Sequence, residues 1–125
     1  PPRSTLFPYT TLFRSYRLAA RFTHLGGLRV GAPVEVAGVP VGRVRQVELD
    51  QDFTARVTMD IGAGLELSSD TIASIRTKGL IGGKYILLEP GAMDDILRDG
   101  GELEETESAF DIESIVSRLV QGNVK

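Results

Sequence analysis

The sequence predicts a mainly β protein, a small barrel or sandwich followed by one C-terminal α-helix. Apolar and polar residues alternate in several short segments, and Gly or Pro separates these segments at intervals of roughly 8–12 residues. Near the C-terminus the apolar spacing changes from two residues to three or four, which is typical of one face of a helix.

Each predicted strand rests on alternation or on an apolar run between turn residues. The clearest is 16–23, in which Leu18, Ala20 and Phe22 share one face and Arg17 and Arg21 share the other. The other predicted strands are 34–36, 41–49 with a bulge near Gly42, 55–61, 71–77, the apolar run 85–89 and a short edge strand at 102–104.

The C-terminal segment predicts a helix over 109–121. Ser108 and Asp111 have the spacing of a capping box, and Gly122 can end the helix. The apolar stripe either packs on the barrel or meets copies of itself in an oligomer, and the sequence favours neither. It consists of Ile112, Ile115, Val116, Leu119 and Val120.

The first fifteen residues differ from the rest of the chain. They contain no acidic residue and three of the six Pro, and 5–15 resembles the in-frame translation of a common sequencing adapter. We therefore expect 1–15 to be non-native and disordered. The predicted organisation is then 1–15, a β-barrel domain over 16–107, and a helix with tail over 108–125.

Composition and charge exclude several kinds of function. The chain has 125 residues, 42% hydrophobic and 25% charged, which is ordinary for one globular domain. It has no Cys, so disulfides, thiolate metal sites and thiol nucleophiles are excluded. Residues 89–125 hold ten acidic residues against three basic ones. This acidic half argues against a nucleic-acid partner, which requires a basic face.

No catalytic template is present, and we do not expect an enzyme, a metal site or a cofactor. His24 is the only His, and its place beside Gly26 and Gly27 is typical of an exposed loop. The segment 79–84 lacks the Walker spacing, because Lys78 and Tyr85 stand where that motif needs Gly and Ser or Thr. Asp94 and Asp95 are interpreted as solvated charge.

Several turns carry large apolar residues, which is unusual because loops are normally polar. Leu80 and Ile81 lie among three Gly and are flanked by Lys78 and Lys84. Packing considerations alone favour their folding back into the core. The turns at 26–28 and 38–42 pose the same question, since an apolar tip that stays exposed implies an apolar partner.

Motifs in a fixed order resemble the MCE (mammalian cell entry) domain family, specifically its phospholipid-transport members. The resemblance covers about 16–121. It rests on Leu25-Gly26-Gly27-Leu28, Gly31-Ala32-Pro33-Val34, Gly38-Val39, Val41-Gly42-Arg43-Val44, Asp70-Thr71, Ser74-Ile75-Arg76-Thr77, Gly79-Leu80-Ile81-Gly82 and Tyr85, and then on Leu97, Gly100, Thr106, Ser108 and Ala109.

The resemblance implies a seven-stranded β-barrel that assembles as a homohexameric ring. The family's pore loop corresponds to Gly79, Leu80, Ile81, Gly82 and Gly83, and Leu80 and Ile81 would then form an exposed apolar constriction. The C-terminal helix would line the axis or the underside of the ring.

The resemblance also implies a role in an ABC-type phospholipid transport system between inner and outer membrane. Its expected partners are phospholipid, an inner-membrane permease, a cytoplasmic ATPase and a soluble periplasmic lipid carrier. We expect a periplasmic domain anchored in the inner membrane by a helix of the parent protein that this chain lacks. The alternative is a monomeric β-barrel adaptor whose loops bind a protein.

Overall fold

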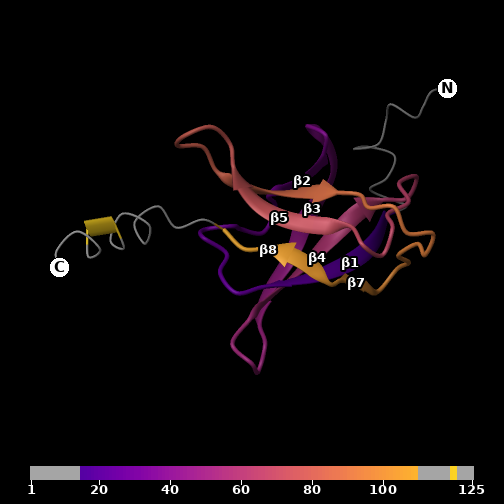
Figure 1. The fold of residues 1–125 in the computed structure, drawn as a ribbon, viewed down its shortest axis with the longest axis horizontal. Coiled ribbons are helices and arrows are strands. Elements are labelled where there is room, and N and C mark those ends of the chain that lie inside the picture. Colours follow the sequence, from indigo (N-terminus) through magenta and orange to yellow (C-terminus); the bar gives the residue numbers. More distant parts are fainter. Residues whose placement is uncertain (1–14, 110–118, 121–125) are drawn as a thin grey trace.

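The computed structural model of the chain describes residues 15–109 and 119–120. These residues form one mixed sheet of eight strands in the order β7-β1-β4-β3-β2-β6-β5-β8, which curls around a single interior (Figure 1). The mainly β fold is therefore confirmed. The strands are β1 (Ser15–Phe22), β2 (Pro33–Val36), β3 (Val39–Leu49), β4 (Ala55–Gly62), β5 (Ile72–Thr77), β6 (Lys84–Glu89), β7 (Gly101–Leu103) and β8 (Glu105–Glu107).

Strands β7 and β8 close the curled sheet into a nearly complete barrel. β7 pairs in parallel with β1, β8 pairs in parallel with β5, and only Glu104 separates them along the chain. Just beyond β8, Ser108 Oγ accepts a hydrogen bond of 2.9 Å from the backbone N of Thr23. The structure thus has eight strands where the family resemblance implies seven, because 101–107 forms two short strands separated by Glu104. The short edge strand predicted at 102–104 corresponds to β7, which stands at one end of the strand order next to β1.

The inward faces of the strands fill the barrel. In β1, Leu18, Ala20 and Phe22 are buried and Arg17 and Arg21 are about half exposed, as the alternation predicts. Ala19, which the alternation places on the outer face with the two Arg, is buried as well. A fully buried Leu or Phe side chain stabilises the fold by about 1.5–3 kcal/mol. The buried apolar residues of the core are Leu18, Ala20, Phe22, Leu28, Val34, Val41, Val44, Val57, Met59, Ile61, Leu67, Ala73, Ile75, Ile86, Leu88 and Leu103.

Two irregularities interrupt the ladder of β3. Its pairing with β2 shifts opposite Val41, beside Gly42, which is where the sequence predicts a bulge. Its pairing with β4 shifts again at Arg45. A Cβ at Gly42 would overlap the backbone of Asp60, so glycine is required for this close approach. Bulges of this kind re-aim side chains and increase the local twist.

The predicted C-terminal helix lies mostly outside the described residues. Of 109–121, the structure describes Ala109, which is not helical, and Leu119 and Val120, which are helical and exposed. The described residues therefore do not support the helix as an element of the fold. Ile112, Ile115 and Val116 lie outside them, as does 1–14. In the part of the chain that the structure describes, no helix is long and apolar enough to cross a membrane.

Candidate functional site

The β5–β6 loop, residues 78–83, carries the most exposed apolar pair of the described chain. Leu80 is 96% exposed and Ile81 is 97% exposed, and the loop extends beyond the body of the barrel (Figure 1). The two side chains do not fold back into the core, so the expectation from packing alone is wrong. The exposed tip that the family resemblance implies agrees with the structure.

Glycine shapes this loop at specific positions. The backbone N of Lys78 donates to the carbonyl of Gly83 at 3.0 Å, and the N of Gly82 donates to the carbonyl of Lys78 at 2.9 Å. A Cβ at Gly82 would overlap that same carbonyl, and Gly79 has a φ of +66°, which disfavours other residues. The turn thus presents Leu80 and Ile81 at its apex.

A charged contact braces the base of the loop. Lys78 Nζ lies 2.6 Å from Glu35 Oε2, and the Glu35 side chain is only 6% exposed. The same ammonium lies 4.4 Å from the centroid of the Tyr85 ring, within the range of a cation–π contact. On the opposite strand Lys84 Nζ donates to Thr77 Oγ1 at 2.6 Å. The contacts of Lys78 with Tyr85 and of Lys84 with Thr77 join the two arms of the hairpin below the tip, and the contact with Glu35 ties its base to β2.

The chemistry of the tip is purely apolar. Residues 79–83 contain three Gly, one Leu and one Ile, so no side chain there can donate a proton, accept one or bind a metal. What the tip can do is bury apolar surface, at about 25 cal/mol per Å² removed from water. The arrangement suits an apolar partner and no bond-making chemistry.

The other candidate residues of the sequence have structural or solvent-exposed positions. His24 is exposed, as predicted, and its Nδ1 accepts a hydrogen bond of 2.9 Å from the backbone N of Gly26. Asp94 and Asp95 are exposed as well. Within 15–109 and 119–120, no group of three His, Cys, Asp or Glu residues is placed to hold a metal ion.

The remaining apolar turn residues divide between core and surface. Leu28 and Val41 are buried, whereas Val39 is about half exposed at 53%. Glycine next to a bulky residue therefore allows the side chain to turn in either direction. The β5–β6 loop is the one of these turns whose two large residues both face solvent.

Sequence reasoning missed Glu35 and the tip of the β3–β4 hairpin. Glu35 alternates with Val34 and Val36, a phase that predicts a solvent-facing carboxylate, yet it is 5% exposed. Its partner Lys78 is 43 residues away along the chain, so no local signal reveals the pair. The position of Phe53 directly after the polar turn 50–52 could have indicated that this aromatic residue is exposed.

Comparison with known proteins gives consistent matches. A family model described as MlaD protein matches residues 14–91. The chain is 37% identical over 116 residues to the intermembrane phospholipid transport system binding protein MlaD of Escherichia coli (strain K12), covering 87% of this chain and 63% of that protein. It is 33% identical over 117 residues to the protein of the same name from Haemophilus influenzae, covering 90% of this chain and 70% of the relative.

A solved structure shows the same fold. A chain of the Acinetobacter MlaFEDB complex in an ATP-bound conformation superposes with a TM-score of 0.78 at 22% identity, covering 85% of this chain and 81% of that one. This chain spans 63% of the length of the Escherichia coli relatives that it matches. From the family match and the identity to curated relatives, we conclude that the chain belongs to the MlaD protein family.

Proposed function

We propose that this chain is the lipid-binding and lipid-transfer subunit of an ABC-type phospholipid transport system. Copies of it form a homo-oligomeric ring, expected to be a hexamer, and act with an inner-membrane permease, a cytoplasmic ATPase and a soluble periplasmic carrier. Membership of the MlaD family and the names of its Escherichia coli and Haemophilus influenzae relatives support this role. The domain itself works in the periplasm.

The observation that carries the proposal is the braced, fully exposed Leu80–Ile81 tip. In a ring each copy contributes one tip, and the tips together form a narrow apolar opening. An acyl chain that enters this opening exchanges water for aliphatic contacts, which is the favourable step. The three Gly of the loop allow neighbouring tips to approach closely, because they add no side-chain bulk.

In this proposal the chain performs no bond chemistry. The partner ATPase supplies the energy, and this subunit supplies an apolar conduit that favours acyl chains over water. The purely apolar content of 79–83 supports this division of labour.

The test replaces both tip residues, Leu80→Asn with Ile81→Asn, in the transporter reconstituted with its permease and ATPase. Transfer of a fluorescent phospholipid between vesicles should fall about tenfold or more, because burying a whole Leu or Ile side chain contributes about 1.5–3 kcal/mol and 1.4 kcal/mol is a factor of ten. The fold should persist, since both side chains are outside the core. Met93→Asn, at an exposed apolar residue of another loop, is the matched control.

Transfer at the wild-type rate by the Leu80→Asn/Ile81→Asn variant would contradict the proposal. Native mass spectrometry of the full chain measures the stoichiometry and any retained phospholipid in one experiment. A mass of one subunit without lipid would instead favour the monomeric adaptor.

A further inference from the structure

The β3–β4 hairpin carries a second exposed apolar pair that the proposed function does not use. Leu49 is 71% exposed and Phe53 is 81% exposed. The hairpin extends away from the barrel body as a narrow two-stranded ribbon (Figure 1). We call residues 48–54 the hairpin tip. No contact within the barrel accounts for two large apolar side chains at the end of this ribbon.

The backbone at Phe53 is strained. Its φ is +64°, in the left-handed region that a bulky residue rarely adopts. The N of Phe53 donates to the carbonyl of Asp50 at 2.9 Å, and the N of Asp50 donates to the carbonyl of Thr54 at 2.8 Å. In such a loop Gly is the usual residue at this position. An aromatic side chain that is strained and packed on nothing in its own barrel points to a role outside it.

The hairpin tip is acidic. Asp50 is paired with Arg21 at 3.0 Å. Glu48 accepts from Gln46 Nε2 at 2.9 Å and Asp52 accepts from Thr54 Oγ1 at 2.7 Å. Neither Glu48 nor Asp52 forms an ion pair with another residue of the described ranges. The tip therefore offers an apolar knob with two carboxylates that lack a cationic partner there.

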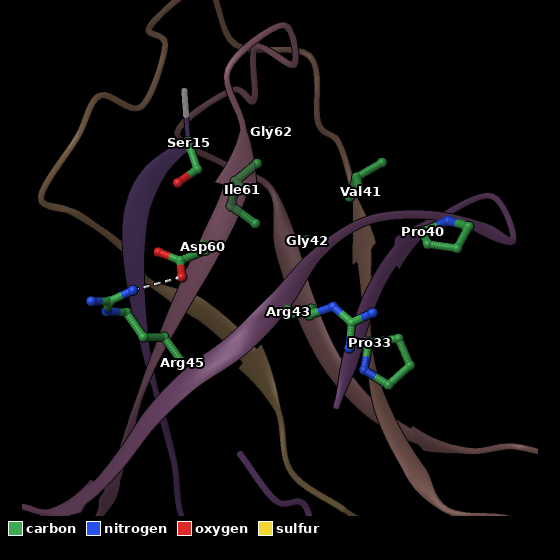
Figure 2. A pocket seen from close by; sticks show the side chains of 10 residues that line it. All are labelled: Ser15, Pro33, Pro40, Val41, Gly42, Arg43, Arg45, Asp60, Ile61 and Gly62. Carbon is green, nitrogen blue, oxygen red and sulfur yellow. Dashed lines mark hydrogen bonds and ion pairs between the residues drawn. The ribbon is translucent and has the colours of Figure 1, made fainter. Parts of the chain in front are cut away.

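A pocket with the opposite character lies at the other end of the same two strands (Figure 2). It has a volume of about 400 Å³. The hairpin tip joins Leu49 to Ala55, whereas the pocket lies along Gly42–Arg45 and Asp60–Gly62. Since a strand rises about 3.3 Å per residue, Arg43 is about 20 Å from Leu49 along β3. We call this site the arginine pocket; it is lined by Ser15, Pro33, Pro40, Val41, Gly42, Arg43, Arg45, Asp60, Ile61 and Gly62.

The arginine pocket combines an apolar floor with excess positive charge. Pro33, Pro40 and Val41 contribute apolar walls, and Figure 2 shows Arg43 beside Pro33 and Pro40, with Arg45 farther away next to Asp60. Arg45 Nη1 is paired with Asp60 at 3.0 Å. Arg43 forms no ion pair among the described residues, and its guanidinium reaches only the carbonyl of Gly31 at 3.4 Å. One guanidinium thus remains available for an incoming carboxylate.

We propose that the hairpin tip of one copy inserts Phe53 and Leu49 into the arginine pocket of the next copy, with Asp52 or Glu48 facing Arg43. This contact rests on the proposed function, because it is the subunit interface of the ring. It joins two different surfaces, so repetition of the contact can close a ring, whereas a two-fold dimer would need one self-complementary surface. Aromatic anchors in pockets and charge pairs at the rim are typical of specific interfaces.

Cysteine cross-linking tests the contact directly, because the chain contains no Cys of its own. The double variant Phe53→Cys/Pro40→Cys should give, on mild oxidation of the full chain, a ladder of covalent species that ends at the size of the ring. Each single variant should give none. The control pair Met93→Cys/Pro40→Cys, in which Met93 is also exposed, should not form the ladder.

Charge exchange tests the specificity of the contact. Asp52→Arg and Arg43→Asp should each raise the concentration at which half of the chain is assembled about tenfold or more, and the double variant should restore assembly. Asp94→Arg, at an exposed acid of another loop, is the matched control. Phe53→Gly should also weaken assembly while leaving the barrel folded, since Gly suits the left-handed turn.

Three results would overturn the contact. Cross-linking of Phe53→Cys alone into dimers would show that two tips meet each other. A closed ring by native mass spectrometry without the double-variant ladder would place the interface elsewhere and leave the proposed function intact. Binding of the tip to phosphatidylglycerol vesicles, lost in Phe53→Gly while the ring persists, would assign it to a membrane. A failure of the lipid role appears separately, as unchanged transfer by the Leu80→Asn/Ile81→Asn variant.

Discussion

The two hairpin tips of this barrel both expose large apolar side chains, but they differ chemically. Leu80 and Ile81 stand among glycines, between lysines, on a loop braced by the contact of half-exposed Lys78 with buried Glu35. The β3–β4 hairpin instead presents Phe53 in a strained conformation, with Leu49, among carboxylates. Exposure alone does not say what each tip binds. Their surroundings do, because an uncharged aliphatic apex suits acyl chains and an acid-flanked aromatic knob suits a basic pocket on a protein.

The largest expected effect is on the shape of the β5–β6 loop. Gly82→Ala places a methyl group against the carbonyl of Lys78, which accepts a hydrogen bond within the same turn. The turn must open, at a cost of about 3 kcal/mol, the upper end of the overpacking range. The free energy of unfolding from urea titration should fall accordingly, and lipid transfer should fall with it.

The neighbouring glycine supplies the control for this variant. A Cβ at Gly83 meets nothing within 4 Å, and its φ is not in the left-handed region. Gly83→Ala should therefore leave the unfolding free energy nearly unchanged. Equal losses in the two variants would show that the loop requires flexibility rather than a defined turn, and would weaken the contrast with the β3–β4 hairpin.

The next effect concerns the brace below the loop. Lys78→Met keeps the length of the side chain and removes the ammonium, so the carboxylate of Glu35 loses its partner in a largely buried position. Leaving a buried polar group unsatisfied costs about 1–3 kcal/mol. We expect a loss of about 2 kcal/mol in thermal or urea unfolding, because the half-exposed site admits some water.

Lys84→Met is the matched substitution on the opposite strand. Lys84 donates to the hydroxyl of Thr77, a neutral acceptor, and forms no ion pair among the residues described. Its loss should cost clearly less than the loss of Lys78. If the two variants are equally stable, the Glu35–Lys78 contact does not brace the loop.

Local sequence patterns predict the strands of the barrel, but they do not predict strand β8, which closes it, or the Lys78–Glu35 contact. The alternation of β1 identifies Leu18, Ala20 and Phe22 as core because one strand face meets the interior, a property written into adjacent residues. Strand β8 carries Glu-Thr-Glu, which has no apolar residue at all, and it exists because its backbone pairs with β5. Ser74 Oγ donates to Glu107 at 2.8 Å across that pairing, a contact that no short window contains.

The candidate site divides in the same way. Glycine spacing and the resemblance to the MCE family are sufficient to single out Leu80 and Ile81. Neither reveals that Lys78 reaches Glu35, or that Asp99 Oδ1 accepts a 2.8 Å hydrogen bond from the N of Arg17 at the start of β1. Both contacts join segments far apart in sequence, and only the closed barrel brings them together.

A smaller effect, of opposite sign, is expected at the β3–β4 hairpin. Phe53→Gly removes the steric cost of the left-handed conformation, which is about 1–2 kcal/mol for a residue with a side chain. The greater entropy that Gly loses on folding offsets part of this gain. The melting temperature should therefore stay the same or rise slightly. Phe53→Ala keeps a Cβ in the left-handed conformation and should not raise the melting temperature. A marked fall in the melting temperature of Phe53→Gly would mean that the phenyl group of Phe53 packs against its own chain.

The smallest effect separates the two tips by their response to acid. Hydrogen bonds from the hydroxyl and the backbone N of Thr54 hold the pKa of Asp52 below its usual range. A carboxyl whose pKa is lowered by folding stabilises the folded loop above the unfolded pKa of about 3.9. That contribution is lost as the pH falls through the lowered value.

Nuclear magnetic resonance of the Thr54 amide should accordingly show a titration midpoint below 3.9. Thr54→Val, which removes the hydroxyl donor, should move the midpoint upward, and Asp52→Asn should abolish the transition. Residues 79–83 contain no carboxyl group, so the β5–β6 apex has no counterpart of this hydrogen bond. A wild-type midpoint at the ordinary value would mean that Asp52 does not close its loop.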